Sequence, residues 1–128
     1  MDISYTRGQF KIKGKTGSVL AGNEKIIIEG GQPFEINQPG EYEVGGVSVI
    51  GLVGGGYVVE MDGLRLCTAT KSADAGAIDV ALLSELDMEI VKQIDPRVVV
   101  TIGKEGVAKY IISRDKLPTE LTTVCLIK

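Results

Sequence analysis

The sequence predicts a β-rich, layered α/β protein with one or two helices. Two observations lead to this prediction: the first two-thirds of the chain consists of short apolar runs separated by glycine-rich turns, and the last third adds one clear amphipathic helix. Short alternating or β-branched runs of this kind are typical of strands. The length of 128 residues fits one domain, residues 1–128, that can bury a substantial core.

The N-terminal part contains three predicted strands. Residues 9–13 alternate polar and apolar side chains, and the glycine-containing turn 14–17 leads into a second strand at 18–20. A β-branched run at 26–28 follows and ends at a Gly-Gly pair. The pattern therefore indicates short strands joined by tight turns.

Two hairpins come next, each with a two-residue turn. The turns are Gly45-Gly46 and Asp62-Gly63, and both pairs supply the positive φ that such turns require. The strands that they join are 41–44 with 47–50, and 57–61 with 64–67. Because residues 47–53 are apolar on both faces of the strand, we expect them to be buried on both sides.

The last third of the chain combines strands with a helix. Residues 78–83 form an apolar strand, and Ser84 then fits a helix N-cap with the acidic Asp87 three residues later. An apolar stripe at helical spacing continues to Pro96, which ends the helix. The other expected elements are strands at 98–100 and 122–127 and, if there is a second helix, residues 104–112.

The chain contains no histidine, and this absence limits its chemistry. Histidine is the commonest metal ligand and the side chain that titrates near neutral pH. Zinc sites built on histidines are therefore excluded, as is Ser-His-Asp or Cys-His catalytic machinery. Cys67 and Cys125 lie in apolar, strand-like runs, so we expect core thiols, with a disulfide or a reactive thiol as the alternative.

Composition and charge restrict the partners and the compartment. Four Tyr and two Phe, with no Trp, disfavour a nucleic-acid partner bound through stacked bases. The net charge of −3 is uneven, because residues 29–95 carry twelve acidic and three basic groups between two basic ends. This distribution suits intramolecular complementarity or head-to-tail association of subunits. No apolar run approaches the roughly 20 residues of a membrane helix, and no signal peptide follows Met1, so we expect a cytoplasmic protein without a membrane partner.

Three motifs resemble known sites but lack the context that those sites need. Gly14-Lys15-Thr16 looks like the end of a phosphate-binding loop, but strands flank it and no helix follows, so it indicates a hairpin turn. Residues 113–116 and 15–17 match parts of a serine β-lactamase signature in reversed order. Several carboxylates could pair, but most of them flank hairpin turns, where charged groups face water. They are Glu41, Glu43, Glu60, Asp62, Asp74 and Asp79.

A set of segments in a fixed order carries a family resemblance. The segments are residues 38–49, 57–67, 78–83 and 89–100, with a looser match at 3–5 and 10–14. Together they resemble the metallo-β-lactamase fold family, and within it the branch that contains the L-ascorbate-6-phosphate lactonases. The resemblance implies a sandwich of two sheets between outer helices, here in a shortened form.

The resemblance also implies where metal ligands would lie, and each position departs from the family pattern. The histidine-rich loop would fall between Ile28 and Phe34, where residues 29–33 contain no histidine. A histidine and a bridging aspartate would follow Cys67, where this chain has residues 68–71, and Gly103 stands in the place of another histidine. Lys71, at the aspartate position, would repel a cation. The resemblance thus implies the fold without the activity: no catalytic residue, no metal and no cofactor.

We expect a non-catalytic, metal-free scaffold or interaction module that associates with itself. The alternatives are a small-molecule-binding domain that keeps the ancestral cleft and a hydrolase of changed chemistry that uses carboxylates, Cys67, Thr68 or Lys71. Self-association is expected because the strands 47–53 and 78–83 are apolar on both faces and one helix offers little cover. A two-fold dimer is the simplest closed solution, with its contact near the ends of the chain and away from the acidic middle.

Overall fold

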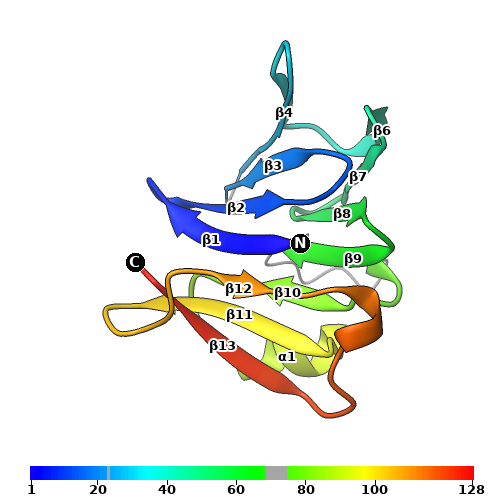
Figure 1. Cartoon of the computed structure of the whole chain (residues 1–128). Helices are drawn as coiled ribbons and strands as arrows, with labels where there is room; N and C mark the ends of the chain where they lie inside the picture. Colours follow the sequence, from blue (N-terminus) through cyan, green and yellow to red (C-terminus); the bar gives the residue numbers. More distant parts are fainter. Residues whose placement is uncertain (23, 69–74) are drawn as a thin grey trace.

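Two β-sheets and one α-helix form the part of the chain that the computed structural model describes, residues 1–22, 24–68 and 75–128 (Figure 1). The β-rich class predicted from the sequence is therefore confirmed, with a single α-helix in these ranges. Lys71 and Asp74, which the sequence singled out, lie outside the described residues.

Sheet A contains six strands, and all neighbouring strands in it are antiparallel. In spatial order they are β12 (Tyr110–Ile111), β1 (Asp2–Thr6), β2 (Gln9–Lys13), β3 (Ser18–Ala21), β4 (Ile26–Glu29) and β5 (Phe34–Ile36). The three strands predicted in the N-terminal part are present as β2, β3 and β4. The Gly14-Lys15-Thr16 segment joins β2 to β3, as expected for a hairpin turn rather than a phosphate-binding loop.

Sheet B contains seven strands and changes from antiparallel to parallel along its width. In spatial order they are β13 (Thr122–Ile127), β11 (Val98–Gly103), β10 (Val80–Leu82), β9 (Leu64–Thr68), β8 (Tyr57–Met61), β7 (Val47–Gly51) and β6 (Gly40–Val44). The strands β6 to β9 form the two predicted hairpins, and Gly46 and Gly63 have the positive φ values of 85° and 74° that their turns need. The strands β9, β10, β11 and β13 run parallel.

The two sheets face each other and enclose the main core. Ile12 and Val19 of sheet A and Val59 and Leu66 of sheet B are among the apolar side chains buried between them. The chain passes from sheet A to sheet B between β5 and β6, at residues 37–39 (Figure 1). The inward positions alternate with outward ones along each strand, so the buried set follows from the period of two in the sequence.

The helix α1 (Met88–Ile94) lies on the outer face of sheet B and forms a third layer there. Its buried residues Val91 and Ile94 belong to a second core, which includes Cys67, Ala81 and Val99 from the parallel strands. This cover reaches only part of the outer face, because α1 has seven residues. No helix within the described ranges is both long enough and apolar enough to cross a membrane.

The N-cap of α1 differs from the prediction. Asp87, not Ser84, caps the helix, and its Oδ1 accepts hydrogen bonds from the backbone N–H groups of Glu89 (3.0 Å) and Ile90 (3.4 Å). Ser84 lies too close to the sheet, since the neighbouring Leu83 still donates to the Val100 carbonyl at 2.9 Å. Ser and Asp are both favourable N-cap residues. Asp87 takes the position here because the chain stays paired with β11 as far as Leu83, so the helix begins only at Met88.

Residues 104–112 do not form the second helix that the sequence allowed. Val107 instead forms an isolated bridge with Leu126 of β13, and Tyr110 and Ile111 form β12 beside β1. Gly106 permits this path, because a Cβ there would lie 2.5 Å from the Cys125 carbonyl oxygen. The segment therefore runs extended along the edges of both sheets.

The expectation that residues 47–53 are buried on both sides is wrong at its C-terminal end. Val47 and Val49 point into the main core, and Ile50 packs on the opposite face against the second core. Val53, however, is 83% exposed, because the strand ends at Gly51 and the chain turns through a glycine-rich loop. Apolar composition therefore overstated the length of the buried strand.

Candidate functional site

The positions that the resemblance assigns to metal ligands do not meet at one place. Thr68 ends β9 and Gly103 ends β11, so both lie at the carboxyl ends of parallel strands in sheet B. The segment 29–33 follows β4 at the opposite end of the sandwich, where Ser18 pairs with Glu29. Within the described residues, no three His, Cys, Asp or Glu side chains gather closely enough to hold a metal ion.

The space beside Thr68 is closed. Thr68 is buried, and its Oγ1 accepts a hydrogen bond from the backbone N–H of Tyr57 at 2.9 Å. The hollow next to it has a volume of only about 10 Å³, and Phe10 and Leu82 are among the residues that line it. Its burial and the small adjoining space disfavour Thr68 as the nucleophile of the hydrolase alternative.

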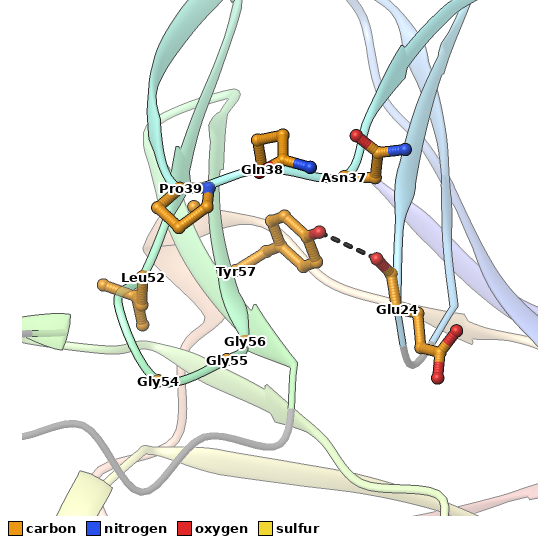
Figure 2. Close-up of a pocket in the computed structure, with 10 residues that line it drawn as sticks. Glu24, Asn37, Gln38, Pro39, Leu52, Gly54, Gly55, Gly56 and Tyr57 are labelled. Atoms are coloured by element: carbon orange, nitrogen blue, oxygen red, sulfur yellow. Dashed lines mark hydrogen bonds between the residues drawn. The ribbon is translucent and has the colours of Figure 1, made fainter.

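A larger hollow of about 280 Å³ lies at the same end of the sandwich (Figure 2). Tyr57 connects the two places, because its N–H binds Thr68 and its ring faces this second hollow. The Tyr57 hydroxyl donates to the Glu24 carbonyl at 2.8 Å, and burial, followed by Tyr42 and the Glu24 carboxylate, raises the pKa of this phenol. The remaining walls include the amide residues Asn37 and Gln38, the apolar Pro39 and Leu52, and a glycine loop, residues 54–56.

At the opposite end of the sandwich, hydrogen bonds join a turn of sheet B to a turn of sheet A. Asp62, in the β8–β9 turn, accepts hydrogen bonds from the Lys15 backbone N–H (2.8 Å) and the Thr16 hydroxyl (3.3 Å) in the β2–β3 turn. Gly14 leaves room for this contact, since a Cβ there would lie 2.6 Å from Asp62 Oδ2 and would have to displace that side chain. The backbone N–H of this turn that would bind a phosphate is thus occupied by a carboxylate of the same chain.

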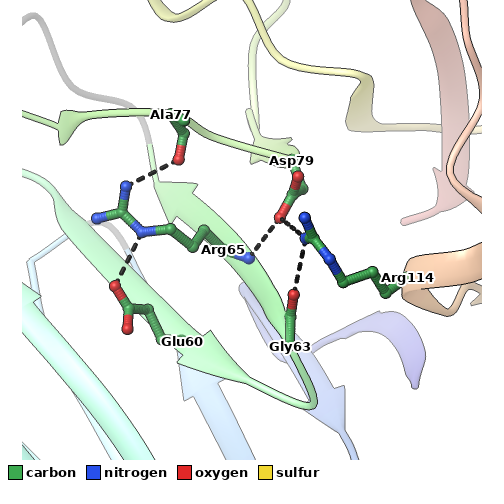
Figure 3. Close-up of polar contacts among 6 residues, drawn as sticks. All are labelled: Glu60, Gly63, Arg65, Ala77, Asp79 and Arg114. Atoms are coloured by element: carbon green, nitrogen blue, oxygen red, sulfur yellow. Dashed lines mark hydrogen bonds and ion pairs between the residues drawn. The ribbon is translucent and has the colours of Figure 1, made fainter.

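Arg65, Asp79 and Arg114 form a polar network on the outer side of β9 (Figure 3). Asp79 Oδ2 accepts from the Arg65 backbone N–H at 2.9 Å and from Arg114 Nη1 at 3.4 Å. The Arg65 guanidinium donates to Glu60 (2.8 Å) and to the Ala77 carbonyl (2.8 Å). Most of these hydrogen bonds connect different segments of the chain. The network therefore holds β9, the residues before β10 and the turn at 114–116 together.

Three glutamates lie on the part of sheet B that α1 leaves open. Glu41 and Glu43 are two positions apart on β6 and therefore lie on the same face of the sheet. The pairing register places Glu43, Ser48 and Glu60 side by side on that face. Together with Ile50 they line an open hollow of about 350 Å³, which we name the acidic trough. The sequence predicted these carboxylates near turns, but it did not predict that they share one face of sheet B. The register of the two glycine turns is the signal that could have shown it.

The two cysteines differ in their surroundings. Cys67 is buried, and desolvation, only partly offset by Arg65, raises the pKa of its thiol to about 12. Cys125 is half-buried, with its Sγ 3.4 Å from the Glu105 carbonyl oxygen. Both are free thiols, and Cys67 is a core residue as predicted. A thiol with so high a pKa is a poor nucleophile, which disfavours Cys67 for the hydrolase alternative.

Three exposed apolar side chains lie along the edges where the sheets end in β12 and β13. Val107, Ile111 and Ile127 are 50%, 63% and 46% exposed. Val107 and Ile127 are neighbours, since the Ile127 N–H donates to the Val107 carbonyl at 2.9 Å, and Ile111 lies on the edge strand of sheet A. Their side chains follow this edge and point to different faces of the sandwich. We name these three edge residues the C-terminal apolar patch.

Comparisons with known proteins identify no relative. No protein-family model, no curated protein and no solved structure matches the chain. The assignment of a function therefore depends on the geometry of the chain itself.

Proposed function

We propose that this protein is a non-catalytic, metal-free interaction module with a shortened metallo-β-lactamase-like fold, and that it associates with itself through the C-terminal apolar patch. The exposure of the patch is the observation that carries the proposal. Three branched side chains, Val107, Ile111 and Ile127, keep about half or more of their surface in water at the edges of both sheets. Contact with a second copy would remove this surface from water and stabilise the complex.

The fold part of the proposal is supported by the layers. Two sheets enclose one core, and a parallel portion of sheet B carries α1 on its outer face. The sequence segments resemble the family in their order. The outer face of sheet A needs no helix, because Lys11 and Glu29 place charged groups there and the Ser18 hydroxyl donates to Glu29 at 2.9 Å. These polar groups are consistent with a two-sheet arrangement in which one α-helix, among the described residues, covers a sheet face.

Light scattering across a hundredfold dilution tests the proposal. We expect a mass above 13.6 kDa that falls on dilution. The variant V107S/I111S/I127S should weaken association roughly 100-fold, because each substitution removes about 1 kcal/mol of apolar contact. The matched control V53S/L86S/M88S changes three other exposed apolar residues and should associate like the parent. A parent mass near 13.6 kDa at every concentration would refute self-association.

A second candidate is supported by the hollow around Tyr57. Its volume of about 280 Å³ is close to the lower end of known ligand pockets, about 300 Å³, and it adjoins the carboxyl ends of parallel strands, where ligands often bind. A small-molecule-binding domain would use this hollow. A thermal-shift screen tests it: a ligand whose stabilisation is abolished in Asn37→Ala but kept in Asn37→Gln would support binding there.

A further inference from the structure

The strand β6 lies at one edge of sheet B, and within the described residues it pairs with β7 alone. All five of its residues, Gly40–Val44, are in register with β7. On an edge strand, alternate residues direct their backbone N–H and C=O groups away from the sheet, where a further strand can pair with them. The edge is therefore a place where an extended peptide can add to the sheet through main-chain hydrogen bonds.

The outer face of this edge is acidic. Glu41 and Glu43 lie two positions apart on that face and border the acidic trough. Glu60, the third carboxylate of the trough, pairs with Arg65 at 2.8 Å, whereas neither Glu41 nor Glu43 has an ion-pair partner among the described residues. An added strand would place every second side chain beside these two carboxylates. Basic residues fit best there, because cross-strand pairs of opposite charge stabilise a sheet.

The inner face of the same edge is apolar. Tyr42 and Val44 alternate with the two glutamates and pack against the main core, and both are half-buried. Phe34 of β5 lies across from Tyr42, with 6.3 Å between the ring centroids, and is 42% exposed. The other set of side chains on an added strand would meet this surface, and apolar side chains would remove it from water.

We infer that the edge strand β6 binds an extended segment of another protein, in which basic residues alternate with apolar ones. This inference goes beyond the proposed self-association, because it concerns the other edge of sheet B and a different partner. The edge of a second β6 would be repelled, since glutamates would stand beside glutamates. Residues 10–13 of this chain have the alternating pattern, but β2 pairs with β1 and β3 on its two sides, so a folded copy cannot supply it.

Titration with a labelled peptide that alternates lysine and valine, followed by fluorescence anisotropy, tests the inference. We expect saturable binding to the parent protein, and weaker binding as salt is raised. A control peptide has the same composition with its lysines and valines in two separate blocks. It should bind at least 10-fold more weakly, because alternation is what places each kind of side chain on its own face of the strand. In NMR spectra, the alternating peptide should slow the hydrogen exchange of backbone N–H groups in β6.

Charge reversal on β6 tests the role of the two carboxylates. E41K/E43K should weaken binding of the alternating peptide at least 10-fold, because each attraction becomes a repulsion. The control E85K/E120K makes the same change in net charge at exposed sites outside β6 and should bind the peptide like the parent. A peptide with glutamate in place of lysine should show the reverse preference and bind E41K/E43K more tightly than the parent.

The results that overturn the inference are distinct from those that concern self-association. No binding to the parent at millimolar peptide, equal binding of the alternating and block peptides, or protection of N–H groups on other strands in place of β6 would each overturn it. The variant V107S/I111S/I127S should bind the alternating peptide like the parent. If the parent is monomeric at every dilution and still binds the peptide, self-association is refuted and the inference about β6 stands.

Discussion

Replacing Asp79 by alanine should lower the free energy of unfolding by about 2 kcal/mol. The change leaves the Arg65 backbone N–H, which donates to Asp79 Oδ2 at 2.9 Å, without its partner in a half-buried position. A donor stranded in this way costs about 1–3 kcal/mol. The lost ion pair with Arg114 adds little, because that side chain is 65% exposed and water screens the 3.4 Å contact.

Urea unfolding and thermal melts, both followed by circular dichroism at one fixed protein concentration, measure this loss. For a chain of this size we expect a fall in Tm of roughly 6–10 °C and an unchanged slope of free energy against urea. Asp79→Asn is the matched control, because its side-chain oxygen still accepts from Arg65 while the charge is gone; it should lose less than about 1 kcal/mol. Equal losses in the two variants would refute the hydrogen-bond explanation, and a D79A variant as stable as the parent would refute the role of the whole network.

Three further predictions concern the turn, the thiols and metal. Gly63→Ala should destabilise by about 1 kcal/mol in thermal melts because φ is +74° there, and a variant that melts with the parent would contradict the turn geometry. In a thiol-reagent assay at pH 8, Cys125 should react first and Cys67 only on unfolding, since burial raises the pKa of Cys67 to about 12; two equally fast thiols would count against it. The Cys67 thiol ionises near pH 9 in the unfolded chain but keeps its proton in the folded protein up to about pH 12. The folded protein should therefore lose stability as the pH rises from about 9 toward 12, and this group should have no effect on stability at lower pH. Purified protein should contain no stoichiometric zinc or iron, and chelator should leave Tm unchanged; metal whose removal lowers Tm would overturn the metal-free reading.

Local sequence signals predicted the strands and hairpins well because the physics that sets them is local. Asp62-Gly63 and Gly45-Gly46 can adopt positive φ at both turn positions, and that property alone joins two strands with little dependence on the rest of the chain. The register of each hairpin then follows from its turn. The same reasoning correctly removed the Gly14-Lys15-Thr16 segment from the candidate phosphate sites.

The predictions that were wrong or missing concern positions whose structure is set by contacts with distant segments of the chain. Gly106 and Val107 follow β13 because their backbone meets Cys125 and Leu126, and no spacing within residues 104–112 encodes that contact. The acidic trough was missed for the same reason, since Glu43 and Glu60 become neighbours only through the pairing of three strands. The metal positions implied by the family resemblance were aligned along the chain, but residues 29–33 lie at the far end of the sandwich from Thr68.

The pairing of β1 with β12 has a consequence for synthesis of the chain. Ile3 is matched with Tyr110, so β1 is completed on that side only after β12, far along the chain, has emerged from the ribosome. At about 5–20 residues per second, that side of β1 waits on the order of 5–20 s for its neighbour. During this time β1 presents an open strand edge, which other nascent chains or chaperones can bind. Fusions that delay release of the C-terminal residues should therefore reduce the soluble yield more than fusions at the N-terminus.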